Sequence, residues 1–369
     1  MLIKVQAIYL QRTDLYKILI FMLLYTFWSV RVSATEPDSL FRSEEIILLE
    51  LRSDFKAIEA SRTGDPEYFD GELIYNNPGG ESEKFSVKVM ARGHFRRDTA
   101  ICSFPPLLVN FKGKEVRNTI FDNQDKLKIV TPCQNEEDVV EEYMVYKMYN
   151  EVTDLSMKVR LAKILYYDTS SNRKLFEKYS FFVEDKSNTA KRNELTVKDR
   201  FITPFDLNQE NFKKMAIFEY LVGNKDWHVT SRKNIVLMQS EDRSIGLIAV
   251  PYDFDLSGFV NPDYSKPEGV PEYMLADKRV YKGLCYTGDE LKETFEFYKK
   301  LKPVFESMIM DQELIPKSSR KQITRYVNES YSVIENENLF KKVFASTCQS
   351  RKDFNLAEVK LSSAEEGTK

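Results

Sequence analysis

Apolar and polar residues alternate over short stretches in the first half of the chain, which is the pattern of strands with one buried face. The turn-forming residues 76–80 (NNPGG) lie directly before the alternating residues 85–91, so a hairpin is predicted there. One helix, over residues 136–151, interrupts the strands, because its apolar residues recur at helical spacing. The alternation predicts strands at 46–51, 68–75, 85–91, 107–111, 127–130, 158–167 and 175–183.

Helical spacing dominates the second half of the chain. A sheet followed by helices predicts an α+β fold of two lobes: a β-rich lobe at 35–183, mostly antiparallel and with one helix, and a mainly helical lobe at 184–349 that carries metal-binding loops. A polar tail at 350–369 is expected to be disordered. The pattern predicts helices at 184–193, 206–222, 289–310, 318–330 and 331–344, and short strands at 235–238 and 245–250.

Four polar residues stand at the ends of apolar elements within residues 218–258. Asp226 follows a helix that Gly223 can end, since glycine accepts the left-handed conformation common at helix ends. Asn234 precedes the first short strand, and Asp253 and Asp255 follow the second. A carboxylate in such a place can face a cleft while a packed core holds its backbone.

This order of residues suits a phosphotransferase. A loop Asp orients or deprotonates the acceptor hydroxyl, while an Asn and a second Asp hold Mg²⁺ on the nucleotide phosphates. Mg²⁺ prefers oxygen ligands, which amides and carboxylates supply. The alternative for each residue taken singly is an ordinary solvated turn, where Asp and Asn are common.

Three features of the first half could serve a nucleotide. Lys126 and Lys128 share one face of a predicted strand, where Glu141 or Glu142 of the following helix could pair with them. Arg92 begins a compact basic segment, RGHFRR, which could cover phosphates. The alternatives are a solvent-facing strand edge for the lysines and a plain surface turn for the basic segment.

Composition limits the class of protein. Hydrophobic residues make up 42% of the 369, which is ample for a core. The formal net charge is −3 without a basic block, so a nucleic-acid binder is not expected. Only two His are present and no C-x-x-C occurs, which makes a zinc site improbable.

Residues 1–34 have the composition of a signal peptide. Three basic residues precede the apolar run 18–30, and the small residues of Val-Ser-Ala at 32–34 offer a cleavage site. The run of 13 residues is short for a membrane span. We therefore expect export to the periplasm, the cell envelope or the extracellular space, without a membrane span after cleavage. An uncleaved anchor is the alternative.

The four Cys predict two disulfides, because an even number of Cys after an export signal is typical of secreted proteins. Three connectivities are possible. The preferred one joins Cys102 to Cys133 and Cys285 to Cys348, each pair within its own half of the chain. Four buried thiols are the alternative.

Several of these segments, taken in order, resemble a known family. They are RGHFRR, DKLKIVTPC, EYMVYKMYN, GNKDWH, NIVLM and VPYDFDLSG. The chain resembles the CotH-type proteins, from about Arg92 to Cys285, and most of all an exported bacterial branch without an assigned function. That family is related to the atypical kinases of the secretory pathway.

The resemblance implies a two-lobed protein-kinase-like fold that binds ATP and Mg²⁺ and phosphorylates Ser or Thr of a protein substrate. It implies that Lys128, or Lys126, contacts phosphate and that Glu142 is its partner on the helix. Glu184 would lie near the adenine, in the segment joining the lobes.

The resemblance further implies that Asp226 is the catalytic Asp, and that Asn234 and Asp253 hold the metal. Asp255 would be a second metal or supporting residue. Two features depart from typical kinases: Asn234 follows Asp226 by eight residues instead of five, and there is no H-R-D triplet.

Two other classes of function compete with an exported kinase. The first is a catalytically inactive, kinase-like scaffold or binding module at the cell envelope, where ATP is scarce. The second is an acid/base hydrolase that uses the paired carboxylates Asp253 and Asp255. The sequence carries the Lys, the Glu and the two Asp that activity requires together, which favours the kinase.

Overall fold

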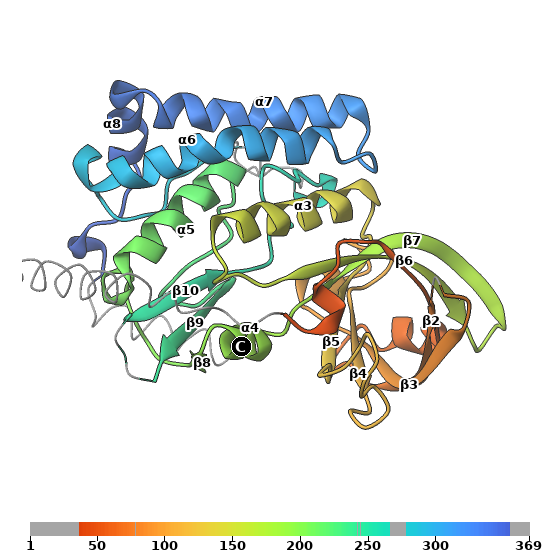
Figure 1. Ribbon diagram of the computed structural model, residues 1–369. Coiled ribbons are helices and arrows are strands. Elements are labelled where there is room, and N and C mark those ends of the chain that lie inside the picture. The colour runs from red at the N-terminus through yellow and green to blue at the C-terminus, as the bar shows by residue number, and fades with distance from the viewer. Residues whose placement is uncertain (1–36, 78, 242, 244, 266–277, 355–369) are drawn as a thin grey trace, which may run out of the picture. The chain divides into compact units, whose positions relative to one another are not determined.

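The computed structural model describes residues 37–77, 79–241, 243, 245–265 and 278–354, all within one unit, Glu36–Lys369. The strands of the first half close into a seven-stranded barrel in the order β1-β2-β3-β4-β5-β7-β6 (Figure 1). These strands are β1 (Ile47–Ser53), β2 (Phe69–Asn76), β3 (Ser82–Ala91), β4 (Leu107–Phe111), β5 (Lys126–Val130), β6 (Val159–Asp168) and β7 (Arg173–Val183).

Alternation along the strands fills the barrel. In β3 the side chains of Phe85, Val87 and Val89 are buried while their neighbours are exposed or half-buried, and they join one core with side chains from the other strands. Closure comes from β1, which is antiparallel to β2 and parallel to β6, with Leu49 opposite Ile164. The expected, mostly antiparallel sheet is therefore a closed barrel with one parallel pair.

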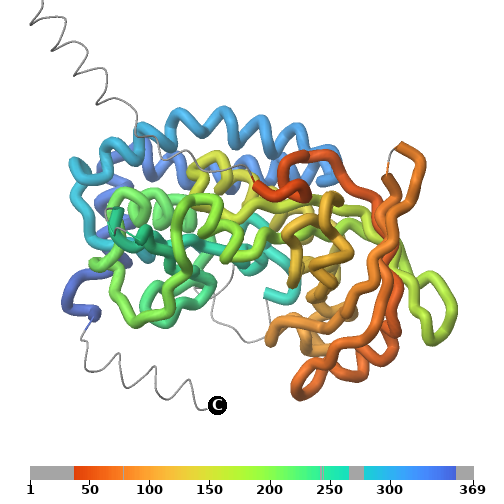
Figure 2. Tube along the Cα trace, turned by 60° about the horizontal axis from the view of Figure 1, so that its bottom comes forward, coloured from red at the N-terminus to blue at the C-terminus, as the bar shows by residue number. Residues whose placement is uncertain are grey.

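Helices and a second sheet make up the rest. A three-stranded antiparallel sheet has the order β10-β9-β8. Helices α6 and α7 lie side by side in both overall views (Figures 1 and 2). The bounds are α2 (Phe55–Ala60), α3 (Glu137–Val152), α4 (Lys186–Arg192), β8 (Leu195–Lys198), α5 (Gln209–Val222), β9 (Ile235–Ser240), β10 (Leu247–Pro251), α6 (Gly288–Met310), α7 (Lys317–Ile334) and α8 (Glu337–Ala345).

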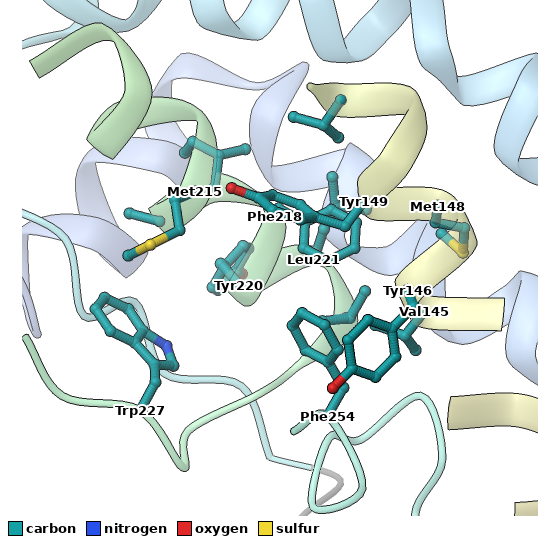
Figure 3. Packing of buried hydrophobic residues seen from close by; sticks show 14 of the residues in the cluster. Val145, Tyr146, Met148, Tyr149, Met215, Phe218, Tyr220, Leu221, Trp227 and Phe254 are labelled. Carbon is teal, nitrogen blue, oxygen red and sulfur yellow. The ribbon is translucent and has the colours of Figure 1, made fainter. Parts of the chain in front are cut away.

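An aromatic core joins α3 to α5. Tyr149 of α3 lies 4.8 Å from Phe218 of α5, measured between ring centroids. Phe254, from the loop after β10, packs against both helices (Figure 3). Every residue of β10 is buried, as expected for a strand covered on both faces. The loops after α5 and β10 therefore both start from packed elements.

Most elements agree with the sequence predictions, and the α+β class is confirmed. The break between α7 and α8 lies after Ile334, because Asn336 caps α8 with its side chain. Two short elements, α2 and β8, were not expected, since six and four residues are too few to show a period. The predicted disordered tail begins with a 3-10 turn, Arg351–Asp353.

Both expected disulfides are confirmed. Cys102 pairs with Cys133 and Cys285 with Cys348, with Cα–Cα distances of 4.5 and 4.9 Å. The predicted signal peptide, 1–34, lies outside the described residues, as does the tail from 355 on. In the part of the chain that the structure covers, no helix is both long and apolar enough to cross a membrane.

Candidate active site

The loop that carries Asp226 begins where α5 ends. Gly223 adopts a left-handed φ of 69°, and a Cβ at this position would lie 1.9 Å from the hydroxyl of Tyr326. The side chain of Asn224 then accepts a hydrogen bond from the backbone N–H of Asp226 at 2.9 Å. The helix end and this turn fix the backbone of Asp226.

Asn234 returns to Asp226 despite the eight-residue spacing. The loop folds back on itself, with the N–H of His228 bonded to the carbonyl of Lys233 at 2.9 Å. The amide of Asn234 donates to the backbone carbonyl of Asp226 at 2.7 Å and to its carboxylate at 3.0 Å. The ammonium of Lys233 forms an ion pair with the same carboxylate. Asp226 and Asn234 thus belong to one site.

The loop after β10 is joined to this site through its backbone. The N–H of Tyr252 donates to the carbonyl of Asn234 at 3.0 Å. Asp253 has a φ of 65°, which is uncommon for a residue other than glycine, and its N–H donates to the hydroxyl of Tyr146 at 2.8 Å. Phe254 is fully buried, with its ring centroid 4.8 Å from that of Tyr146 (Figure 3). The buried ring anchors the segment between Asp253 and Asp255.

Asp255 faces the protein interior and is only 7% exposed. The hydroxyl of Tyr264 donates to its carboxylate at 3.2 Å, and the guanidinium of Arg96 lies 3.8 Å away. Burial, followed by the negative charge of Asp253, raises the pKa of Asp255 to about 7. These contacts suit the supporting role, which is one of the two roles expected for Asp255.

Glu142 pairs with an arginine instead of the expected lysine. Its carboxylate lies 3.6 Å from the guanidinium of Arg96, which also donates to the carbonyl of Thr131 at 2.5 Å. Among the described residues, no ion pair joins Glu142 to Lys128 or Lys126. Burial raises the pKa of Glu142, and Asp255 raises it further against the opposing charge of Arg96. The cation of this pair comes from the segment after β3.

Lys128 nevertheless lies beside the site. Its ammonium is 5.5 Å from the ring centroid of Tyr252. Burial lowers the pKa of Lys128, and the positive charge of Arg92 lowers it further, against Asp185 and Asp253. Lys126, two residues earlier on the same strand, is exposed. The structure therefore separates the two lysines: only Lys128 is near Asp253.

Glu184 has a structural contact that accounts for its burial. Its carboxylate forms two hydrogen bonds with the guanidinium of Arg192, at 3.1 and 3.0 Å. It also accepts hydrogen bonds from the hydroxyl of Thr189 and the N–H of Lys158. Both carboxylate oxygens of Glu184 are therefore already engaged in hydrogen bonds.

A cavity of about 240 Å³ lies next to Lys128. Cationic side chains line it together with apolar residues, three of them from β9, and with Asp199, which pairs with Arg232. The lining residues are Lys128, Met157, Lys186, Val197, Lys198, Asp199, Arg232, Ile235, Val236, Leu237 and Tyr252. Cationic and apolar side chains in one cavity are features that a flat ring carrying phosphates would need.

The oxygen atoms of the site fit Mg²⁺ only in part. In the structure as described, no hydrogen bond or ion pair occupies the carboxylate of Asp253, and Asn234 donates through nitrogen, leaving its amide oxygen. No group of three or more His, Cys, Asp or Glu in the described ranges is arranged to hold a metal. Mg²⁺ usually takes one or two carboxylates and completes its shell with phosphate and water. Asp253 and Asn234 suit that kind of site.

Several residues of the site were missed in the sequence. Arg96 lies in the same basic segment as Arg92, but the sequence does not indicate that Arg96 pairs with Glu142. Lys233 directly precedes Asn234, so its closeness to Asp226 follows from the fold of the loop. Tyr264 and Lys282 carry no motif, and their contacts with this site are visible only in the structure.

Comparisons with known proteins give no family. No family model matches the chain. A search of curated proteins found no significant match either.

Proposed function

We propose that this protein is an exported phosphotransferase of the kinase type, which binds ATP with Mg²⁺ and phosphorylates Ser or Thr of a protein. One observation carries the proposal: hydrogen bonds join Asp226, Asn234 and the backbone next to Asp253, and Lys128 lies beside them. The residues come from three separate elements, as the resemblance to CotH-type proteins implies. Two disulfides support export, since such bonds persist in oxidising compartments.

The proposed reaction assigns tasks to the residues of the site. The acceptor hydroxyl oxygen bonds to the γ-phosphorus, while the bond from that phosphorus to the bridging oxygen breaks and ADP leaves. Asp226 takes the proton of the hydroxyl, and Asn234 holds the Asp226 carboxylate in place. Lys128 offers positive charge to the phosphates.

Mg²⁺, when bound, would neutralise the negative charge of the phosphates. Asp253 is the residue that would hold it, together with the amide oxygen of Asn234. The left-handed backbone of Asp253 supports this role, because strained conformations concentrate at functional sites. Asp255 would support that loop from the interior through Arg96 and Tyr264.

A second candidate is a binding module without transfer. The observation that favours it is the ion pair between Lys233 and Asp226, which occupies the proposed base. The absence of a Lys128–Glu142 pair in the described residues points the same way.

Two substitutions separate these candidates. Asp253→Ala should abolish binding of Mg·ATP, because the phosphates lose their metal. Asp226→Ala should leave binding nearly unchanged and lower phosphate transfer at least about 100-fold, the usual scale for a positioned base. Binding is measured by thermal shift with Mg·ATP, and transfer by γ-labelled ATP with a library of Ser- and Thr-containing peptides. The exposed Asp289→Ala is the matched control.

The outcomes distinguish the phosphotransferase from the binding module. Wild-type binding without any transfer would favour the binding module. If Asp253→Ala binds Mg·ATP as well as wild type does, the metal role of this residue is wrong. Absence of binding by the wild type would reject the proposal.

A further inference from the structure

Lys282 contacts the backbone on both sides of Asp226. Its ammonium donates to the carbonyl of Lys225 at 2.8 Å and to the carbonyl of Trp227. The same ammonium lies 5.2 Å from the ring centroid of Trp227, within range of a cation–π contact. One side chain therefore holds the carbonyls that flank the proposed base.

The segment that carries Lys282 is itself firmly held. The ring of Tyr281 stacks on that of Phe344 with centroids 3.9 Å apart. Three residues after Lys282, Cys285 is bonded to Cys348, and its N–H donates to the carbonyl of Gln349 at 3.0 Å. Lys282 thus extends from a segment fixed by a disulfide to the loop that carries Asp226.

The charge around Lys282 also suits this role. The acidic residues near Lys282 are Glu219, which is buried in α5, and Asp226, while Lys233 is the nearby cation. Burial lowers the pKa of Lys282, and the two carboxyl groups counter that effect. Hydrogen bonds to backbone carbonyls stabilise the half-buried ammonium of Lys282, which does not need an ion pair with Asp226.

We infer that Lys282 is a positioning residue for Asp226, which fixes the backbone of the catalytic loop without touching the substrate. This inference rests on the proposed function. A small displacement of a positioned group lowers catalysis strongly while binding is little affected. The sequence gives no sign of this role, because Lys282 lies 56 residues after Asp226 and outside any motif.

Transfer kinetics test the inference. Lys282→Met should lower kcat at least about tenfold and leave the affinity for Mg·ATP within about twofold of wild type, because the nucleotide contacts come from other residues. Lys282→Arg should recover part of the loss, since a guanidinium can donate to both carbonyls. Lys292→Met, on the exposed side of α6, is the matched control.

A second readout does not need activity. The chain has two Trp, Trp28 and Trp227, so the full chain with Trp28→Phe reports on Trp227 alone. Trp227 is 2% exposed. In that background, Lys282→Met should increase the acrylamide quenching constant of Trp227 about twofold or more, whereas Lys292→Met should not change it.

Failure of the proposed function and failure of the role of Lys282 give different results. A wild type that shows no transfer defeats the proposed function, and the quenching result then decides the role of Lys282 in holding the loop. Unchanged quenching in Lys282→Met would overturn the inference. So would an equal loss of kcat and nucleotide affinity, or a failure of Lys282→Arg to recover any activity.

Discussion

Arg96 and Glu142 face each other across 3.6 Å, which couples the segment after β3 to helix α3. The same guanidinium lies 3.8 Å from Asp255, so two buried carboxylates share one cation. The site loop after β10 is therefore tied to α3 through Arg96. This cation occupies the place that the sequence assigned to a lysine of β5.

Loss of Arg96 should destabilise the protein strongly. Arg96→Met leaves Glu142 and Asp255 buried without a cation, and breaking such a group costs about 3 to 5 kcal/mol. The free energy of unfolding from urea titrations at pH 7 measures the change. Arg97→Met, on the same 3-10 turn (Phe95–Arg97), is the control and should cost less than about 1 kcal/mol.

The pH dependence of this loss has a definite sign. At pH 5 the carboxyls of the variant take up protons and need no cation, so the loss should be smaller at pH 5 than at pH 8. A loss that is independent of pH would argue that Arg96 acts through packing alone.

Glu219 should make the protein less stable as the pH rises. Burial raises the pKa of Glu219 to about 8, although Asn224 and Lys282 oppose this effect. Below pH about 4.5 the carboxyl is protonated in both the folded and unfolded chains; between there and about 8, only the unfolded chain releases the proton. Glu219→Gln should therefore stabilise the protein by about 3 kcal/mol at pH 7 and by less at pH 5.

Urea titrations from pH 5 to 8 check this prediction. The exposed Glu293→Gln on α6 is the control and should show little change at any pH. A stabilisation by Glu219→Gln that does not grow with pH would contradict the raised pKa.

The two lysines of β5 should differ in nucleotide binding. Lys128→Met should weaken the affinity for Mg·ATP about tenfold or more, because Lys128 lies beside Asp253. Lys126→Met should have no effect, because Lys126 is exposed. Calorimetric titration of both variants with Mg·ATP is the measurement. Equal affinities would exclude Lys128 from the phosphate site.

Both disulfides should be present in the purified protein, and removing one should cost stability. Closing a loop of 31 residues, as Cys102–Cys133 does, contributes about 4 kcal/mol in the chain-entropy account. Peptide mapping without reductant checks the pairing, and unfolding of the Cys102→Ser/Cys133→Ser variant checks the magnitude. Four free thiols in the mapped peptides would contradict the pairing.

Local patterns predicted most of the fold. The strand β4 was predicted with its observed bounds, Leu107–Phe111, because alternation and burial agree there. The pairing of Cys102 with Cys133 was the preferred one of three possible connectivities and is confirmed. Barrel closure did not, because the parallel register of Ile47 with Ala162 joins residues far apart in the chain.

The sequence predicted which loops carry the candidate site residues, but not which side chains pair with them. Asp226 and Asn234 stand in a recognisable order, and the hydrogen bonds between them agree with it. The partner of Glu142 could not be predicted, because Lys128 of β5 and Arg96, which follows β3, are both basic and either could pair with it. Only the three-dimensional arrangement decides which cation reaches the helix.

The parallel pairing of β1 with β6 has a consequence for biosynthesis. Until Asp168 has been synthesised, β1 can pair with β2 alone and keeps one open edge. That edge carries the exposed Leu48, and open apolar edges are templates for aggregation. Long-range pairing is also slow. A chain secreted in an extended state would therefore benefit from a holding chaperone until the barrel closes.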